Sequence, residues 1–427
     1  MALDKVVDSA VLDAGMSVVA DAIRAKAGIT DQLVWPEGFK TAVDEIQTGG
    51  GSTTEPLDPM EVYNNTRPSD WLHMPTPNDN EMYLLFHIPD GVSSLLAFTV
   101  TCTGNYTVAL GTVSDDSFVA SSSVNIASGS KYEAELFADD YGDLTSDGNK
   151  QVMVKVSGTN ILTWEPSTHS KKTSPSNFAD WNIVEISCRL PSGTGVKCGD
   201  NTQSLALKKL RYFTWIGKNA VATTNYMFGN CYSLTAIPQM DTSTITNMRY
   251  MFVNCYSLTA VPQMDTSAAR NICATFSNCY SLTSIPQLDT SAATIMGYMF
   301  NGCYSLTSIP QMDTSMVTDM GYMFGNCYSL TAIPQMDTSA ATNMSNMFNN
   351  CYSLASIAFN GSITGWAGCA VSLKGCSLGH AAIVAFFNSL PTITSAKAIT
   401  LTGNPGVSEL TAAEKAIATG KGWTLTL

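Results

Sequence analysis

The sequence predicts a multidomain protein: an N-terminal helical hairpin, an antiparallel β-sandwich, and a C-terminal leucine-rich-repeat-like α/β solenoid with 24-residue repeats. Three observations support this fold class. The chain has 427 residues, which is too long for one compact domain. The spacing of apolar residues changes from helical to alternating beyond the Gly-rich segment 49–56. The tetrapeptide Cys-Tyr-Ser-Leu then recurs at a fixed interval through the second half of the chain.

The composition limits the classes of function. Hydrophobic residues make up 45 % of the chain, so a packed core is expected and global disorder is excluded. Only 13 % of residues are charged, and the net charge is −13. Nucleic-acid binding needs clustered Lys and Arg, so this charge argues against a nucleic-acid partner and against anionic membranes. No run of about 18 apolar residues occurs, so membrane insertion is not expected.

Residues 1–48 have the pattern of two short helices. In the second helix Phe39, Val43 and Ile46 recur at helical spacing. Helices this short bury little surface alone, so we expect them to dock on a partner or on copies of themselves. The Gly-rich residues 49–56 follow as a flexible linker.

Residues 57–202 show alternating apolar and polar positions. Leu96, Phe98 and Val100, for example, alternate with threonines, and clusters of Gly, Asp, Asn and Ser separate such runs. Short strands with frequent turns are typical of an antiparallel β-sandwich.

The repeat that occupies residues 203–382 predicts a solenoid. Six cysteines open the recurring tetrapeptide, each 24 residues after the last: Cys231, Cys255, Cys279, Cys303, Cys327 and Cys351. A single unit cannot bury its own apolar stripe, but stacked units bury a continuous core. Residues 383–427 lose the period and are expected to form a C-terminal cap.

One unit shows how each repeat is expected to fold. Met248, Met251, Phe252 and Cys255 have the spacing of one face of a short helix, and a short strand is expected after them. The third unit departs from the pattern, because Ile272 and Thr275 replace methionines and Cys273 is added. We expect a slightly looser core in that unit.

Candidate chemical sites are few. The repeat cysteines are expected to form a buried ladder of small apolar side chains, not a metal site. Cys369, Cys376 and His380 have a weak metal-like spacing for which core packing is the better interpretation. The acidic segment 139–148 resembles a calcium loop but lacks a closing Glu, so an acidic turn is expected. Neither a catalytic motif nor a cofactor motif is recognisable; we therefore predict a protein that is not an enzyme and needs no cofactor or metal.

Two polar rows of the repeat are the candidate ligand-binding residues. Regular rows of aromatic rings and amides suit glycans or other extended polymers, although identical residues also stack for stability alone. A third row of Asp accompanies them. The tyrosine row is Tyr232, Tyr256, Tyr280, Tyr304, Tyr328 and Tyr352, and the glutamine row is Gln239, Gln263, Gln287, Gln311 and Gln335.

The unit Met-Phe-x-Asn-Cys-Tyr-Ser-Leu…Asp-Thr-Ser…Thr-x-Met over about 225–360 resembles the BspA-like leucine-rich class of bacterial surface repeats, DUF285. This class occurs in adhesins and in phage tail proteins, and the resemblance implies binding, with no catalytic residues. The helix that contains residues 20–28 and the segment 399–423 look like the ends of tail-associated proteins from phages of Gram-positive gut bacteria.

The leading interpretation is a phage tail-tip or fibre protein that binds a glycan or protein receptor on the host surface through the solenoid. Residues 1–48 would bind other virion proteins, and a homo-oligomer is expected, with a trimer as one arrangement. No export signal is recognisable, so we expect synthesis in the host cytoplasm, assembly into the virion and action outside the cell. The alternatives are a structural head fibre or decoration protein, a bacterial surface adhesin, and a glycan-degrading tail enzyme.

Overall fold

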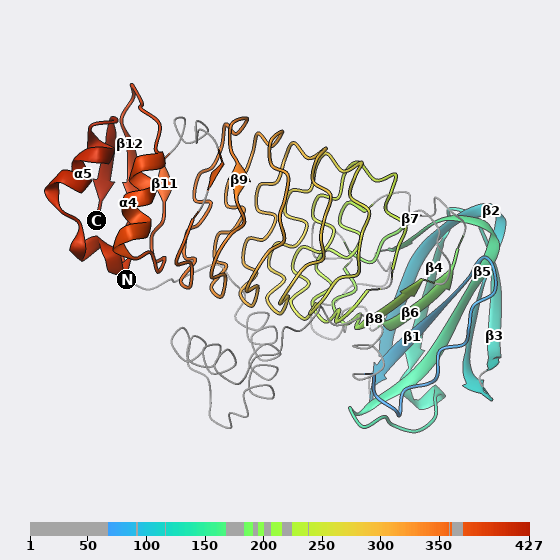
Figure 1. Cartoon of the computed structure of the whole chain (residues 1–427). Coiled ribbons are helices and arrows are strands. Elements are labelled where there is room, and N and C mark those ends of the chain that lie inside the picture. Colours follow the sequence, from blue (N-terminus) through green and yellow to red (C-terminus); the bar gives the residue numbers. More distant parts are fainter. Residues whose placement is uncertain are drawn as a thin grey trace.

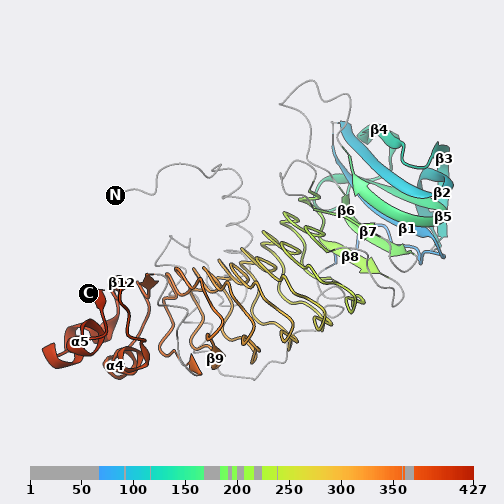
Figure 2. The ribbon, with the colours of Figure 1, turned by 90° about the horizontal axis from the view of Figure 1, so that it is seen from above.

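The structure is a computed structural model that describes residues 67–90, 93–115, 117–167, 183–190, 195–199, 206–215, 224–237, 239–357, 359–360 and 370–427. The predicted hairpin at 1–48 and the linker at 49–56 lie outside the described residues. Three parts follow one another along an elongated molecule: a β-sheet, a stack of coils and a small cap (Figures 1 and 2). A continuous hydrophobic core runs through all three, from Met82 in the sheet to Trp423 in the cap.

The N-terminal part is one connected eight-stranded sheet, which links the strands that the sequence predicts as a β-sandwich. The strand order is β3-β2-β5-β1-β6-β8, with β4 beside β2 and β7 beside β5. The long strand β2 pairs with β4 through its first half and with β3 through its second, which joins what the sequence pattern separates into two sheets. The strands are β1 (Glu81–Pro89), β2 (Ser93–Ser114), β3 (Ser117–Ala127), β4 (Lys131–Phe137), β5 (Asn149–Pro166), β6 (Ile183–Arg189), β7 (Gly195–Val196) and β8 (Tyr212–Trp215).

Strand β1 is buried on both faces. Leu84 and Phe86 point into the main core, whereas Tyr83 and Leu85 belong to a second cluster that includes Trp71. Strand β8 links the sheet to the coils. It pairs in parallel with β6, and its Tyr212 bridges in parallel to Ala236 of the first coil.

The predicted α/β solenoid is wrong, because the coils are a β-solenoid and contain no helix in the residues that the structure describes. Met248, Met251, Phe252 and Cys255 do face the core, but two tight turns place them there. Tyr250 and Asn254 both have φ of 60°, in the left-handed region that interrupts a helix. The backbone therefore forms four-residue turns, such as the one closed by the hydrogen bond from the Met251 amide to the Met248 carbonyl at 3.2 Å.

Stacking holds the coils together from one repeat to the next. The buried phenylalanines form a continuous stack with ring centroids 5.5 to 5.8 Å apart: Phe228, Phe252, Phe276, Phe300, Phe324 and Phe348. The cysteine ladder is fully buried, as the sequence predicts, and its members are free thiols. From Cys255 to Cys351 each thiol donates to a phenylalanine carbonyl of the preceding coil, as Cys303 does to Phe276 at 3.1 Å, whereas Cys231 donates to the Cys198 carbonyl at 3.5 Å. Burial raises the pKa of such a thiol, as at Cys303, so the thiol stays protonated and can donate this hydrogen bond.

The C-terminal part closes the solenoid with a small α/β cap. Its two α-helices, α4 (His380–Ser389) and α5 (Ala412–Thr419), are the only ones in the described residues, and neither is long and apolar enough to cross a membrane. Thr411 and Glu414 form a capping box at the start of α5. The remaining elements are β9 (Met336–Asp337), β10 (Phe359–Asn360), β11 (Val371–Ser372), β12 (Lys397–Thr400), β13 (Trp423–Thr426), and the 3-10 helices η1 (Ala138–Asp140) and η3 (Pro405–Glu409).

Candidate functional site

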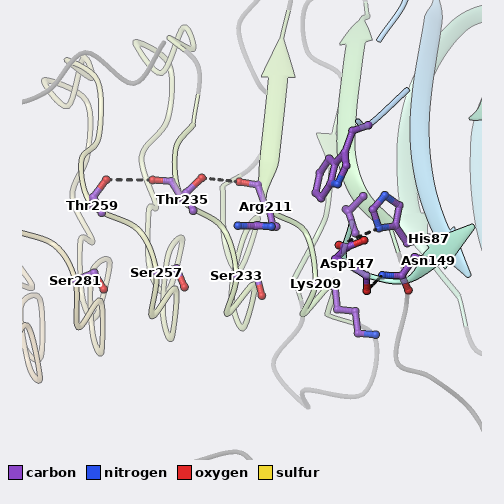
Figure 3. A pocket seen from close by; sticks show the side chains of 12 residues that line it. His87, Asp147, Asn149, Lys209, Arg211, Ser233, Thr235, Ser257, Thr259 and Ser281 are labelled. Carbon is purple, nitrogen blue, oxygen red and sulfur yellow. Dashed lines mark hydrogen bonds and ion pairs between the residues drawn. The ribbon is translucent and has the colours of Figure 1, made fainter. Parts of the chain in front are cut away.

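A pocket of about 400 Å³ lies where the sheet meets the first coils, and we call it the junction pocket (Figure 3). One wall comes from the sheet and its loops, and the other from successive coils of the solenoid. The lining residues are Trp71, His87, Asp147, Asn149, Val184, Lys209, Arg211, Ser233, Thr235, Ser257, Thr259 and Ser281.

The sheet wall is built around a buried histidine. The ring of His87, on β1, makes an edge contact with Trp71 at 4.6 Å between centroids, and Arg211 lies 5.5 Å from the Trp71 ring. The Nε2 atom of His87 and the Nε1 atom of Trp71 are buried and make no hydrogen bond to the residues that the structure describes. Two orphaned polar atoms side by side are costly unless something in the pocket pairs with them.

The charges of the sheet wall are mixed. Burial lowers the pKa of His87 to about 4, and the nearby Lys209 and Arg211 reinforce that shift, so His87 is neutral near pH 7. Asp147 partly opposes the shift from 3.8 Å, measured from its Oδ2 to His87 Nδ1. Burial works against the ionised form of Asp147, but hydrogen bonds from Thr145 and Asn149 outweigh it and lower its pKa. The pocket therefore presents two cations and one carboxylate.

The solenoid wall carries two rows of hydroxyl groups that run along the coils (Figure 3). In the threonine row, Thr235 donates to the Arg211 carbonyl at 3.0 Å and Thr259 to the Thr235 carbonyl at 3.4 Å. The serine row, Ser233, Ser257 and Ser281, is different. Within the part of the chain that the structure describes, these hydroxyls make no hydrogen bond, so they retain their capacity for a ligand.

The predicted tyrosine row forms a separate stack. Neighbouring ring centroids lie 4.4 to 4.9 Å apart, and from Tyr256 to Tyr328 successive rings are parallel within 3°. Burial raises the pKa of these phenols. Because each inner ring covers the face of the next, the row offers ring edges and hydroxyl oxygens, not open faces.

The predicted glutamine row is exposed, but its amide nitrogens hold adjacent coils together. Gln239 donates to the Gln263 carbonyl at 2.5 Å, and Gln311 donates to the Gln335 carbonyl at 2.8 Å. Gln263 and Gln287 make the same contact to the following coil. The row therefore contributes to the stacking of the coils. The side-chain carbonyl oxygens of these glutamines are the atoms that remain for a ligand.

The other candidate positions are structural in the described residues. Cys376 is buried and its thiol donates to the Phe348 carbonyl at 3.4 Å, while His380 contacts Glu414 at 3.0 Å. Cys369 lies outside the described residues. No group of three or more potential metal ligands occurs where the structure describes the chain. In the aspartate row, Asp241 accepts hydrogen bonds from the amide and hydroxyl of Ser243, as in an Asx turn.

Sequence reasoning missed the junction pocket. A histidine within the apolar strand Glu81–Pro89 was a usable signal, since a buried imidazole needs a partner or a role. Asp147 belongs to the predicted acidic turn, but its approach to His87 depends on the tertiary structure. The serine row was present in the recurring Cys-Tyr-Ser-Leu motif, beside the tyrosines.

The family model described as "Mycoplasma protein of unknown function, DUF285" matches residues 222–332 and 303–374. These ranges cover the coils of the solenoid and leave out the sheet and most of the cap. No curated protein matches the chain. The solenoid is thus similar to the DUF285 repeat family, which is the BspA-like class that its motif resembles.

Proposed function

We propose that this chain is a phage tail protein that binds a polysaccharide on the surface of a host bacterium. The observation that carries the proposal is the serine row, whose open hydroxyls run along the coils into the junction pocket. A polymer lying on this row would meet Ser281, Ser257 and Ser233 in turn and end beside Trp71 and Arg211. Hydroxyl groups pair with sugar hydroxyls, and an aromatic ring covers an apolar sugar face.

The proposed activity is binding without cleavage of the polymer. Glycoside hydrolysis ordinarily uses two carboxyl groups that flank the scissile bond. Among the described lining residues Asp147 is the one carboxylate, and its neighbour His87 is neutral near pH 7. The pocket thus has the mixture of aromatic, hydroxyl and charged groups that suits recognition.

The placement in a phage tail rests on sequence resemblance. Residues 20–28 and 399–423 look like the ends of tail-associated proteins, while the DUF285 match is shared with bacterial surface proteins. A structural head protein and a bacterial adhesin are the competing assignments. Immunogold electron microscopy of particles from a lysate of the encoding strain separates the three: label on tails supports the proposal, and label on heads or on cell envelopes contradicts it.

The binding proposal is tested with the full chain, fluorescently labelled, on a panel of intact Gram-positive gut bacteria. We expect binding to some strains, with at least a tenfold loss for the double variant Ser257→Ala/Ser281→Ala and for Arg211→Ala. The matched control is Ser315→Ala, because Ser315 is an exposed repeat serine whose hydroxyl is bound to Asp313 at 2.7 Å. Equal binding by all four proteins would remove the serine row from the function.

A further inference from the structure

The third coil interrupts a second row of tyrosines on the solenoid. Tyr226, Tyr250, Tyr298 and Tyr322 occupy equivalent positions in their repeats, and the third repeat has Ala274 there. All five residues have left-handed backbones, with φ between 52° and 60°. The backbone of the third coil is therefore regular, and only the ring is missing.

The missing ring leaves a gap in the aromatic stack, which we call the coil-3 gap. The ring centroids of Tyr226 and Tyr250 lie 4.6 Å apart with the rings tilted by 31°, and Tyr298 stacks on Tyr322 at 4.8 Å. Between Tyr250 and Tyr298 the interval spans two coils, roughly 10 Å at ~4.8 Å per coil. Ala274 is buried at its base, and Tyr298 is 44 % exposed, an unusual value for a large apolar side chain in this structure.

One of the two basic side chains of the repeats lies at this gap. Between residues 225 and 354 the sequence has Arg249 and Arg270, no other Arg, and no Lys. The guanidinium of Arg249 lies 4.4 Å from the Tyr250 ring centre and donates to its hydroxyl at 2.8 Å. Its charge also acts on the thiol of Cys273, so the guanidinium lies near the third coil. Within the described residues it has no carboxylate partner. The charge of Asp319 acts on Cys273 and Tyr298, and this carboxylate accepts a hydrogen bond from Asn343 at 2.9 Å.

We propose that the coil-3 gap binds one carboxylate-bearing sugar ring, such as a uronic acid unit of an acidic polysaccharide. The ring of the sugar packs on the exposed face of Tyr298, and its carboxylate pairs with the guanidinium of Arg249. Most of the other polar rows use their side chains to join neighbouring coils. Coil 3 instead has Ala274 in place of a tyrosine, and the Arg249 guanidinium lies beside the space this leaves. An acidic sugar requires this combination of space and positive charge.

The test uses the full chain and defined oligosaccharides in isothermal titration calorimetry. We expect binding of an oligogalacturonate of four to six units, weakened by salt, and at least tenfold weaker binding of the matched neutral galactose oligomer. Arg249→Ala and Tyr298→Ala should each lower the affinity for the oligogalacturonate at least tenfold. Arg249→Lys should recover part of the affinity that Arg249→Ala loses, because Lys restores the charge without the planar fork.

Ala274→Tyr is the decisive variant. Tyrosine already adopts this backbone conformation at four equivalent positions, so the variant should fold with an unchanged or raised melting temperature while it fills the gap and abolishes binding. Tyr322→Ala, a ring outside the gap, should keep the affinity within twofold. The proposal is overturned if the wild-type chain does not bind oligogalacturonate, if neutral and acidic oligomers bind equally, or if Ala274→Tyr binds as well as the wild type.

This inference stands apart from the proposed function, because the coil-3 gap and the junction pocket share no residue. Arg211→Ala should leave oligogalacturonate binding unchanged, so either site can fail its test while the other passes.

Discussion

Replacement of His87 should remove a large part of the acid sensitivity of the fold. The imidazole is 3 % exposed and packs against Trp71, and its pKa falls from 6.5 to about 4 in the folded chain, chiefly through burial. The unfolded chain takes up a proton below pH 6.5, whereas the folded chain does not until about pH 4. The stability that the neutral histidine supports is thus complete above pH 6.5 and declines as the pH falls from 6.5 to 4.

The size of the effect follows from the shift. A difference of about 2.5 pKa units at 1.36 kcal/mol per unit corresponds to about 3 kcal/mol. Urea unfolding followed by tryptophan fluorescence at pH 7, 6, 5 and 4 measures it. We expect wild type to lose about 3 kcal/mol more than His87→Gln over this range, since carboxylates that also titrate are common to both proteins. His73→Gln, at an exposed histidine, should track the wild type. Parallel curves for wild type and His87→Gln would refute the assignment of a buried neutral imidazole.

Three further predictions concern the solenoid and the cap. Phe300→Ala removes a fully buried ring that stacks at 5.8 Å on both neighbours, and it should lower the free energy of unfolding in urea by about 3–5 kcal/mol. Gln287→Ala removes one hydrogen bond between coils and should lower it by about 1 kcal/mol. Equal losses would contradict the importance of the phenylalanine stack. Thr411→Ala removes the capping box of α5 and should lower stability by about 1 kcal/mol, with faster amide exchange confined to 412–419 if the cap acts locally. Maleimide labelling with peptide mapping should modify the half-buried Cys273 well before the ladder cysteines such as Cys303, whose pKa is raised by full burial; simultaneous labelling would show that the coils open readily.

The inward positions of the solenoid could be predicted from the sequence, but the backbone that presents them could not. Met248, Met251, Phe252 and Cys255 are buried as their spacing indicates. That spacing fits two turns of a helix. It fits equally well two four-residue turns that each contain a left-handed residue, Tyr250 in the first and Asn254 in the second. Asn254 was a hint of the second solution, because asparagine tolerates a positive φ. Tyr250 gave no such hint, since tyrosine rarely adopts that conformation outside a context that enforces it.

The junction pocket was beyond sequence reasoning for a different reason. Trp71, His87 and Arg211 come from three separate segments and have no common spacing. They meet because β8 pairs with β6 while Tyr212 bridges to the first coil, a parallel arrangement that no local pattern encodes. Strand patterns predicted the presence of β-structure in this region, yet they could not reveal that β2 would join all of it into one sheet.

Exact repetition constrains where this solenoid can recognise anything. A side chain that recurs every 24 residues lies beside its own copies, and most polar rows here bond along that axis: Asn254 donates to Asn230 at 2.6 Å, and Thr266 donates to the Asp289 carbonyl at 2.7 Å. Polar side chains that bond along this axis have fewer donors and acceptors left for a ligand, and their hydrogen bonds make the solenoid more rigid. Recognition is therefore expected where the rule is broken: at the serine row, which forms no such bonds, at the junction where the repeats begin, and at the third coil, where a ring is missing. If Ala274→Tyr and Ser257→Ala/Ser281→Ala both left every binding activity intact, this reasoning would fail, and the regular tyrosine edges would become the surface to test.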